Sequence, residues 1–338
     1  MGKRHMKILF FCRGSAGFIE RDIVHLKHLG DVEVFDAAQM NVGRYVQALW
    51  SARTKSTGLL YCWFAGRHAL FPAAVAKLWH KPLVIVAGGW DVASVPEIQY
   101  GLMRGGLKKV LAQWILKSAA LILAVSESNL KEILENTGVN PKHVKLIPHG
   151  VEIPETVVLP EAKEELVISV GEVTKANLAR KGIETFVETA RLMPEKRFCL
   201  VGRITKEGEK FLRDRASSNL VTPGYIRREE LNQLFRKSAV YVQVSYHEAF
   251  GSALAEAMAY GCVPVVTDRF ALPEVAGTCG IYVPYGDAQK TAEGIRKAFE
   301  DLARLSRAAQ ERVARFFPSE ARRERLIQLL QKLDDDNG

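Results

Sequence analysis

Short apolar runs alternate with longer segments of helical periodicity over the first half of the chain. An apolar run of about four to eight residues predicts a buried strand, and apolar residues spaced three or four apart predict a helix. We therefore expect strands at residues 7–12, 32–35, 59–66, 82–87, 121–126 and 144–151. The helices between them are expected within residues 13–30, after a loop, and at 41–53, 71–79, 106–119 and 126–138.

The alternation restarts after a polar bridge bracketed by Pro154 and Pro160. Here we expect strands at residues 166–171, 197–202, 220–225, 240–245, 263–266 and 281–283. The helices are expected at residues 181–193, 208–217, 229–238, 253–260 and 291–306. Pro318 should interrupt the last helical run, because proline lacks the N–H that a helix interior needs.

Continuous apolar strands that alternate with helices indicate parallel sheets covered on both faces. The predicted fold is α/β, with two Rossmann-like doubly wound domains facing a cleft. The predicted domains are residues 1–153 and 154–317, with a C-terminal helix at 318–333 that packs back on the first domain. Such sheets bind ligands at the carboxyl ends of their strands, so the cleft is the expected site.

Composition and charge narrow the class of protein. The 338 residues are 48% hydrophobic and 25% charged, as in ordinary globular proteins. No segment reaches the roughly 20 apolar residues of a membrane span, and the apolar run near the N-terminus is too short for a signal peptide. The five cysteines and eight histidines show no metal-ligand spacing. We expect a cytoplasmic protein with buried, reduced thiols and no bound metal.

The stretch at residues 246–266, YHEAFGSALAEAMAYGCVPVV, carries the densest candidate chemistry. Glu248 and Glu256 flank a Gly-containing turn that leads into an Ala-rich helix. The free N–H groups and the positive dipole end of a helix N-terminus suit an anion such as a phosphate. The two carboxylates could hold hydroxyl groups on either side of it. Solvated glutamates are the alternative, but the alanines around Glu256 leave that helix little polar face.

A second charged loop follows the first strand of the second domain. The segment SVGEVTKANLARKG carries Lys175, Arg180 and Lys181 into a strand-to-helix loop. Basic side chains beside free helix N–H groups can neutralise a diphosphate without a metal. The alternative is a solvated run of charge. It is disfavoured because the turn after Glu248 lies at the same end of the same predicted sheet.

The second domain resembles the donor domain of retaining glycosyltransferases of family four, the two-Rossmann-domain GT-B enzymes also described as glycosyl transferases group 1. The resemblance rests on GEVTKANLARKG, LVGR, ALPEV, GIYVPYGD and the long run from PGYIRREE to GCVPVVTD. Two glutamates separated by seven residues are a weak signal alone, and the following AMAYGCVPVV makes it specific. The first domain is similar more loosely, through GGWD, AVSES and KLIPHGVE.

The resemblance implies roles for individual residues. Glu248 would contact the donor sugar, Glu256 the ribose hydroxyls, and Lys181 the diphosphate. The family usually has an arginine where this chain has Glu172, and Arg180 or Lys175 would replace it. The other donor-binding residues implied are Phe250, Gly251, Ser252 and Ala253 at the phosphate, Tyr225 and Ile226 along the base, and Gly171, Gly202 and Arg203 at strand ends. On the acceptor side the resemblance implies Gly14, Ser15, Ala16, Gly17 and Gly89.

The first domain departs from the family at one sugar contact. Many members have a histidine where this chain has Gly88, which leaves Asp91 as the group that could reach the sugar or an acceptor hydroxyl. In such enzymes the leaving diphosphate can take the proton of the incoming hydroxyl on the same face, which gives retention. The catalytic residues implied are Glu248, Lys181, Arg180 and Asp91.

The implied function is transfer of a hexose from a UDP- or GDP-linked nucleotide-diphospho-sugar to an acceptor hydroxyl, with no metal or other cofactor. A catalytically silent sugar-nucleotide-binding module, or a partner subunit of a glycosyltransferase, is the alternative that Gly88 and the displaced arginine keep open. A nicotinamide dehydrogenase is disfavoured, since RGSAGF lacks the G-x-G-x-x-G fingerprint. Nucleic-acid binding is disfavoured because basic and aromatic residues do not interleave.

The net charge of +9 is uneven along the chain. Residues 1–155 carry 19 Lys and Arg against 12 Asp and Glu, a net of +7, and the remainder carries +2. The helix at 106–119 has three lysines around Trp114, with Leu107, Val110, Leu111 and Ile115 on the same predicted face. Two interpretations stay open. The helix either presents a membrane-surface patch near a lipid-linked acceptor, at the inner face of the membrane, or packs on the core with a basic outer face.

Overall fold

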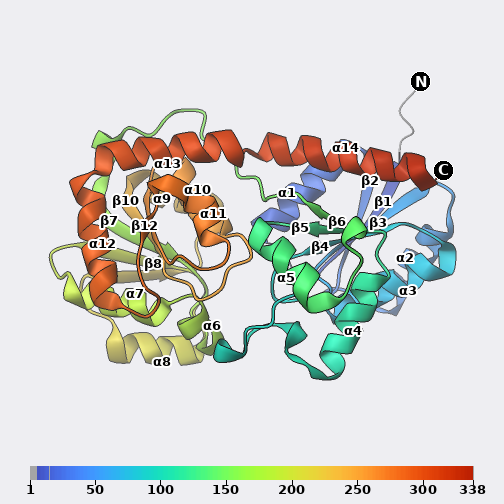
Figure 1. Cartoon of the computed structure of the whole chain (residues 1–338), viewed down its shortest axis with the longest axis horizontal. Helices are drawn as coiled ribbons and strands as arrows, with labels where there is room; N and C mark the ends of the chain where they lie inside the picture. The colour runs from blue at the N-terminus through green and yellow to red at the C-terminus, as the bar shows by residue number, and fades with distance from the viewer. Residues whose placement is uncertain (1–5, 15, 338) are drawn as a thin grey trace. The chain divides into compact units, whose positions relative to one another are not determined.

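The computed structural model describes residues 6–14 and 16–337, the latter without the side chains of residues 334–337. The chain divides into two compact units (Figure 1). Unit 1 comprises residues 1–150 and 319–338, and unit 2 comprises residues 151–318. The division falls after Gly150, where the sequence predicted a boundary after residue 153, and the C-terminal helix belongs to unit 1.

Unit 1 is built on a parallel sheet of six strands in the order β2-β1-β3-β4-β5-β6. The strands are β1 (Met6–Cys12), β2 (Gly30–Asp36), β3 (Thr57–Trp63), β4 (Leu83–Ala87), β5 (Leu121–Ala124) and β6 (Val144–Leu146). All six overlap predicted strands, and β6 is shorter than the predicted 144–151. The direction of strand succession reverses between β1 and β3, so the ligand-binding crevice of this sheet is expected beside the carboxyl ends of those two strands.

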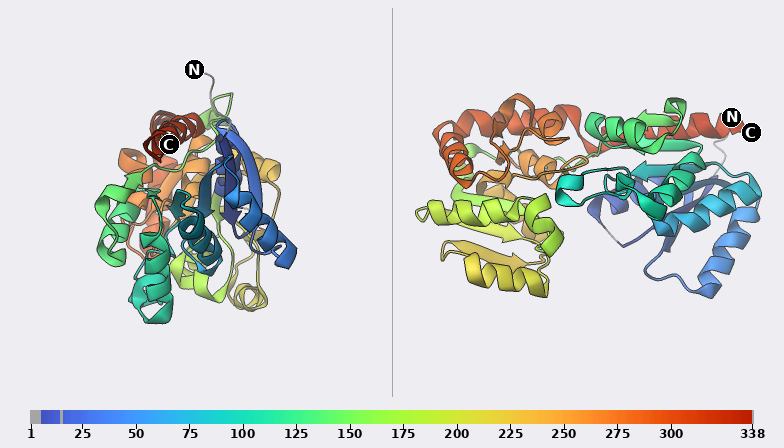
Figure 2. Two further views of the ribbon diagram at one scale, coloured as in Figure 1. Left: turned by 90° about the vertical axis from the view of Figure 1, so that its right-hand side faces the viewer. Right: turned by 60° about the horizontal axis from the view of Figure 1, so that its bottom comes forward.

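Helices cover both faces of this sheet (Figure 2). The apolar core between one face and its helices includes side chains of α2 (Val42–Arg53), α3 (Leu70–Trp79), α4 (Gly106–Lys117) and α5 (Glu127–Thr137). Two further helices pack against each other, α1 (Gly17–Leu26) and α14 (Ser319–Asn337). Short 3₁₀ turns lie at Arg67–Ala69, Pro96–Ile98, Leu102–Arg104 and Pro141–His143.

The apolar face predicted for α4 is only partly covered in the structure. Of its five side chains, Leu107, Val110 and Trp114 are exposed by 88%, 62% and 38%. The sheet covers the neighbouring side of the helix, where the buried residues are Ala112, Ile115 and Leu116. The sheet therefore covers only part of the apolar surface of α4, and the rest of that surface forms an exposed stripe.

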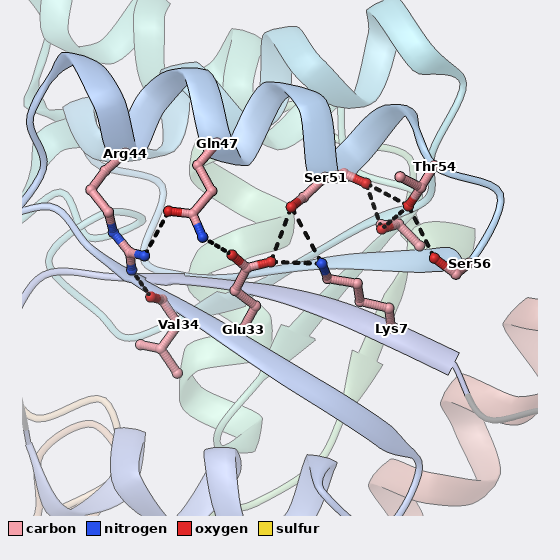
Figure 3. A network of polar contacts seen from close by, with 9 residues as sticks. Lys7, Glu33, Val34, Arg44, Gln47, Ser51, Thr54 and Ser56 are labelled. Carbon is pink, nitrogen blue, oxygen red and sulfur yellow. Dashed lines mark hydrogen bonds and ion pairs between the residues drawn. The ribbon is translucent and has the colours of Figure 1, made fainter.

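Polar contacts join α2 to the neighbouring strand β2, in addition to its apolar packing (Figure 3). Only Ala48 and Ala52 of this helix are buried. The Glu33 carboxylate on β2 accepts hydrogen bonds from Gln47 Nε2 at 2.6 Å and Ser51 Oγ at 3.1 Å. Leu49 also packs against the core, whereas Val42, Val46 and Trp50 of the same helix are exposed.

Unit 2 has a second parallel six-stranded sheet, in the order β12-β11-β10-β7-β8-β9. Its strands are β7 (Glu164–Val170), β8 (Arg197–Val201), β9 (Leu220–Gly224), β10 (Ser238–Gln243), β11 (Val263–Val266) and β12 (Ile281–Tyr282). Numbered within the unit, this is the doubly wound order 3-2-1-4-5-6 read from the other edge. The strand order reverses between β7 and β10, which identifies the carboxyl ends of these two strands as the expected crevice.

The helices of unit 2 depart from the prediction at two points. The loop after β7 contains a short helix, α6 (Lys175–Arg180), because Thr174 caps it by accepting a hydrogen bond from the Asn177 N–H. The single helix predicted at 291–306 is two helices, which meet at Asp301. Pro318 interrupts the last helical run as predicted, since α13 ends at Phe316 and α14 begins at Ser319.

The longer helices of unit 2 otherwise follow the predicted pattern, and the short helix at Leu272–Ala276 and the 3₁₀ turns were not predicted. Its longer helices are α7 (Ile183–Leu192), α8 (Lys206–Arg215), α9 (Arg228–Lys237), α10 (Ser252–Ala259), α12 (Ala288–Glu300) and α13 (Leu302–Phe316). The short ones are α6, α11 (Leu272–Ala276) and 3₁₀ turns at Pro160–Ala162 and Gly277–Cys279. All five cysteines are buried free thiols, as expected.

A buried ion pair fixes α14 to unit 1. The Arg322 guanidinium donates to both carboxylate oxygens of Asp22 on α1, at 2.7 and 2.8 Å, and to the carbonyl oxygens of Ile147 and Pro148. Tyr61 donates its hydroxyl to the same carboxylate at 2.7 Å. Asp22 is fully buried. Burial of the Tyr61 side chain, and next to it the charge of Asp22, raise the pKa of Tyr61 well above its usual value.

We predict that Arg322→Met destabilises the protein by about 3–5 kcal/mol, because it leaves the Asp22 carboxylate buried without its partner. Urea unfolding followed by circular dichroism would measure the loss. The matched control is Arg325→Met, an exposed arginine on the same helix, which should change the unfolding free energy by less than about 0.5 kcal/mol. Equal losses in the two variants would contradict the role of the pair.

Candidate functional site

Three glycines lie side by side at the carboxyl ends of β7, β8 and β9. The Gly171 N–H donates to Val201 O at 2.8 Å, and the Gly202 N–H donates to Gly224 O at 3.0 Å. A Cβ on Gly202 would lie 2.2 Å from Gly171 O, so no larger residue fits there. Arg203 follows, with its guanidinium 3.9 Å from the Glu172 carboxylate, and both side chains are mostly exposed. At Gly171 and Gly202 the missing side chain allows close packing, against the Lys181 side chain and the Gly171 carbonyl, whereas the space beside Gly224 is open.

Lys181 and Glu248 meet between the ends of β7 and β10. Lys181 Nζ lies 2.8 Å from Glu248 Oε1, and Ser245 Oγ donates to the same oxygen at 3.0 Å. The Glu248 side chain is only 11% exposed. Burial alone would raise the pKa of its carboxyl, but the charges of Lys181 and Arg180 outweigh burial and hold the pKa at about 2. Glu248 is therefore an anion throughout the physiological range.

The backbone brings Lys181 to this position. Gly182 has φ +64°, and a Cβ there would lie 2.0 Å from Val244 O, so only glycine permits this approach to β10. The Tyr246 N–H donates to Arg180 O at 2.7 Å, and the Tyr285 hydroxyl donates to Ala179 O at 2.9 Å. The end of α6 is thereby tied to the loop that carries Glu248.

The other two basic residues of this loop stand at opposite ends of α6. The Arg180 guanidinium donates to Asn177 Oδ1 at 2.8 and 3.1 Å, and its charge reaches Glu248. Lys175 is exposed at the first position of the helix, where its charge acts on Glu207. Of the two candidates for the missing family arginine, Arg180 is the one whose charge acts on the Glu248 carboxylate.

The turn after Glu248 ends at the N-terminus of α10. Gly251 caps the helix with φ +94°, and Ser252 and Ala253 are the first two helical residues, partly exposed. The N–H groups of a first helical turn have no partner within the helix, so they can bind an anion. Phe250 is 3% exposed and packs its ring on Phe317, so its side chain belongs to the core.

Glu256 lies on α10 and has an arginine partner that the sequence did not reveal. Its Oε2 is 2.7 Å from Arg228 at the start of α9, and its side chain is 12% exposed. Tyr225 and Ile226 precede α9, and Tyr225 is 76% exposed. In the sequence, Arg227 and Arg228 form a short basic run where α9 begins. Nothing in this run indicated which of the two arginines would face Glu256 on α10.

The first-domain candidates lie in unit 1 at the carboxyl end of β1. Gly14 has φ +78° and donates its N–H to Asp36 Oδ1 at 2.9 Å, and it borders a pocket of about 560 Å³ that Asp36 and Arg44 also line. Ala16 and Gly17 begin α1. Ser15 lies outside the described residues.

Asp91 differs from its predicted role. It is fully buried, and its two carboxylate oxygens accept hydrogen bonds from the N–H groups of Ala65 at 2.8 Å and Gly88 at 3.1 Å. Burial raises the pKa of this carboxyl to about 6. The side chain shapes the loop that contains the buried Gly89, and in this conformation it is not available to a substrate hydroxyl.

The described residues contain no group of three or more His, Cys, Asp or Glu side chains that could hold a metal ion. Within the same part of the chain, no helix is long and apolar enough to cross a membrane.

Comparisons with known proteins give the family. The family model described as "Glycosyltransferase Family 4" matches residues 3–154, and the model "Glycosyl transferases group 1" matches residues 164–301. Among curated relatives, mannosylfructose-phosphate synthase of Agrobacterium fabrum is 26% identical over 175 residues, which are 45% of this chain and 38% of that protein. The tRNA-queuosine alpha-mannosyltransferase of Drosophila melanogaster is 24% identical over 106 residues, 31% of this chain and 26% of that protein. The chain thus matches less than two fifths of the length of either relative.

Solved structures match over nearly the whole chain. HepE of Anabaena in complex with UDP and glucose has a TM-score of 0.80 at 18% identity and covers 97% of this chain and 100% of its own. Sucrose-phosphate synthase of Thermosynechococcus elongatus has a TM-score of 0.81 at 18% identity, over 97% and 99%. These structures share the predicted architecture of two Rossmann-like units. The chain belongs to the group 1 glycosyltransferases of family four and has the GT-B fold.

Proposed function

We propose that this protein is a retaining glycosyltransferase that moves a hexose from a nucleotide-diphospho-sugar to an acceptor hydroxyl without a metal. The observation that carries the proposal is the Lys181–Glu248 pair, which stands at the switch point of unit 2 beside the N-terminus of α10. A cation, free helix N–H groups and a buried anion within one crevice suit a diphosphate joined to a sugar.

In the proposed reaction the bond between the sugar C1 and the diphosphate oxygen breaks, and the acceptor oxygen bonds to C1 on the same face. The proton of the acceptor hydroxyl passes to an oxygen of the leaving diphosphate. Lys181, Arg180 and the first N–H groups of α10 stabilise the negative charge that develops on the diphosphate. Groups that are already oriented toward a developing charge need little reorganisation as the reaction proceeds.

Glu248 acts as a fixed anion in this mechanism. Its pKa of about 2 means that it has no proton to donate at neutral pH. A carboxylate in this state can accept hydrogen bonds from sugar hydroxyls, and it stabilises positive charge that develops at the sugar C1. In this proposal the Glu256 carboxylate, which is paired with Arg228, accepts hydrogen bonds from the ribose hydroxyls. The nucleotide base lies beside Tyr225 and Ile226.

For the donor and the acceptor we propose chemical classes and not individual compounds. The names of the relatives in Agrobacterium and Drosophila contain a mannosyl group, and the HepE complex holds UDP and glucose, which supports a hexose donor and, for HepE, UDP as the nucleotide. A GDP-linked hexose is the other donor that we propose. The acceptor is a hydroxyl on a sugar, a small metabolite or a lipid. The proposed location is the cytoplasm.

We predict that a UDP- or GDP-sugar raises the melting temperature of the protein by several degrees, because a ligand at about 100 times its Kd adds about 2.7 kcal/mol to the folded state. A thermal-shift panel of UDP-, GDP- and ADP-sugars, repeated with EDTA, is the measurement. The shift should persist in EDTA. A shift that EDTA removes would contradict the metal-independent part of the proposal, and no shift with any of these donors would contradict the donor class.

We predict that Lys181→Ala lowers the rate of nucleotide release from the donor identified in that panel by about 10²–10³-fold, since it removes a charged contact to the leaving diphosphate. Lys210→Ala, an exposed lysine on α8, is the matched control and should leave the rate unchanged. Because Lys181→Ala also leaves Glu248 with one fewer partner, Lys181→Ala/Glu248→Gln is included to restore stability. Near wild-type turnover in Lys181→Ala would exclude the proposed role.

We predict that the stabilising effect of Glu248 is lost only in acid. The folded-state pKa of about 2 lies below the ordinary value of 4.5, so the ionised carboxylate stabilises the fold above about pH 4.5, and this contribution disappears as pH falls toward 2. The difference in unfolding free energy between wild type and Glu248→Gln should stay constant between about pH 8 and 5 and then shrink. A difference that shrinks already between about pH 7 and 6 would show that Lys181 does not hold this carboxylate ionised.

A further inference from the structure

The positive charge of the chain is concentrated in one stretch of unit 1. Residues 37–126 contain ten Lys and Arg but only two Asp and Glu, a net of +8 out of +9 for the whole chain. The two acids are Asp91, which is fully buried, and Glu97. Helices α2, α3 and α4 lie in this stretch and contain no acidic residue. Their outer faces therefore carry positive charge without any negative partner from the same helices.

The same three helices expose large apolar side chains. On α4, Leu107, Val110 and Trp114 stand three and four positions apart, so they form one stripe, and Lys108 and Lys117 are exposed beside it. The corresponding residues of the other helices are Val42, Tyr45, Val46 and Trp50 on α2, exposed by 41–80%, and Leu78 on α3, exposed by 58%.

Contacts between basic and aromatic side chains join the three helices into one surface. Lys77 on α3 lies over the ring of Trp114 on α4, at 4.7 Å from the ring centroid. Arg53 on α2 lies 5.5 Å from the ring centroid of Trp50 and 5.7 Å from that of Trp79 on α3. Figures 1 and 2 show α2, α3 and α4 as neighbours within unit 1. We call the exposed apolar and basic side chains of these helices the basic-apolar face.

We propose that the basic-apolar face docks unit 1 on an anionic lipid surface. Lysine and arginine near such a surface are attracted by its negative potential, and apolar and aromatic side chains bury their surface in the headgroup region. Tryptophan, with an apolar ring and a polar N–H, suits that region. The proposal assigns a partner to a surface distant in sequence from the donor site of unit 2, and it does not depend on the identity of the donor.

The composition of the face favours a lipid surface over RNA. Sites for single-stranded nucleic acid combine basic residues with aromatic rings that stack on bases. Here the most exposed apolar residues are aliphatic, Leu107 at 88% and Val42 at 80%. A protein partner with an acidic surface would match the charge, but lipid also accounts for the spread of exposed apolar residues over three helices.

The test is co-sedimentation of the full chain with vesicles of phosphatidylcholine alone or mixed with phosphatidylglycerol, at low and high salt. Lys108→Gln/Lys117→Gln should weaken partitioning to the anionic vesicles by about 30-fold, the change that corresponds to about 1 kcal/mol for each lysine. Leu107→Ser/Val110→Ser keeps every charge and should weaken partitioning at least about 10-fold. Binding of the wild type should fall as salt rises.

Matched controls come from unit 2, where Lys210→Gln/Lys297→Gln removes two exposed lysines and Val157→Ser/Val221→Ser removes two exposed valines. These variants should bind like the wild type. No binding of the wild type to anionic vesicles at low salt, or equal losses in controls and test variants, would overturn the proposal. Binding to an RNA oligonucleotide in place of the vesicles would assign the face to RNA and would also overturn it.

The outcome is separable from that of the proposed function. Vesicle binding is measured without donor, and the thermal shift with a nucleotide sugar is measured without lipid. Loss of vesicle binding in the Leu107→Ser/Val110→Ser variant, with an unchanged donor-induced shift, is the expected result. If the variant also loses the donor-induced shift, its fold has been perturbed. Trp50→Ser on α2 is then the second test, and it should also weaken vesicle binding.

Discussion

The ion pair between Lys181 and Glu248 depends on one backbone contact, and the donor site proposed for unit 2 depends on the ion pair. Gly182 lies so close to Val244 O that any side chain at that position would push the lysine loop away from β10. With the glycine in place, a cation and an anion contributed by two different strand ends meet at the switch point of the sheet. Each holds the other in a partly buried position that neither would occupy alone, because an isolated charge there would lack solvation. The site is therefore ordered before any ligand enters it.

The sequence predicted the features that repeat along the chain. The strands follow from uninterrupted apolar runs, and Pro318 follows from its missing N–H. The two glutamates and Lys181 could be found because they occur at fixed distances within motifs, and the fold then brings Lys181 and Glu248 together. Predictions from such short-range patterns agree with the structure because each depends on only a few neighbouring residues.

Pairings between distant residues could not be predicted in the same way. Asp22 and Arg322 are separated by 300 positions, and nothing around either residue indicates that it is buried. The partner of Glu256 is one of two consecutive arginines, and only the position of α9 selects Arg228. The sequence left two interpretations of α4 open, because periodicity shows that a helix has an apolar side but does not show how much of it the sheet covers.

Gly88 stands where the resemblance to the family predicts a histidine, and the packing of unit 1 around Gly88 depends on the glycine. A Cβ at this position would lie 1.8 Å from the ring of Phe64, so a histidine could enter only if Phe64 moved. Phe64 has φ +68° and contacts the rings of Phe18 and Trp63, which restrain it. The place that many family members give to an imidazole is thus filled by a phenyl ring, and the Asp91 carboxylate, which binds the N–H groups of Ala65 and Gly88, holds the two loops together. Restoring the histidine alone would disrupt this packing, because the loop, the ring and the buried carboxylate form one arrangement.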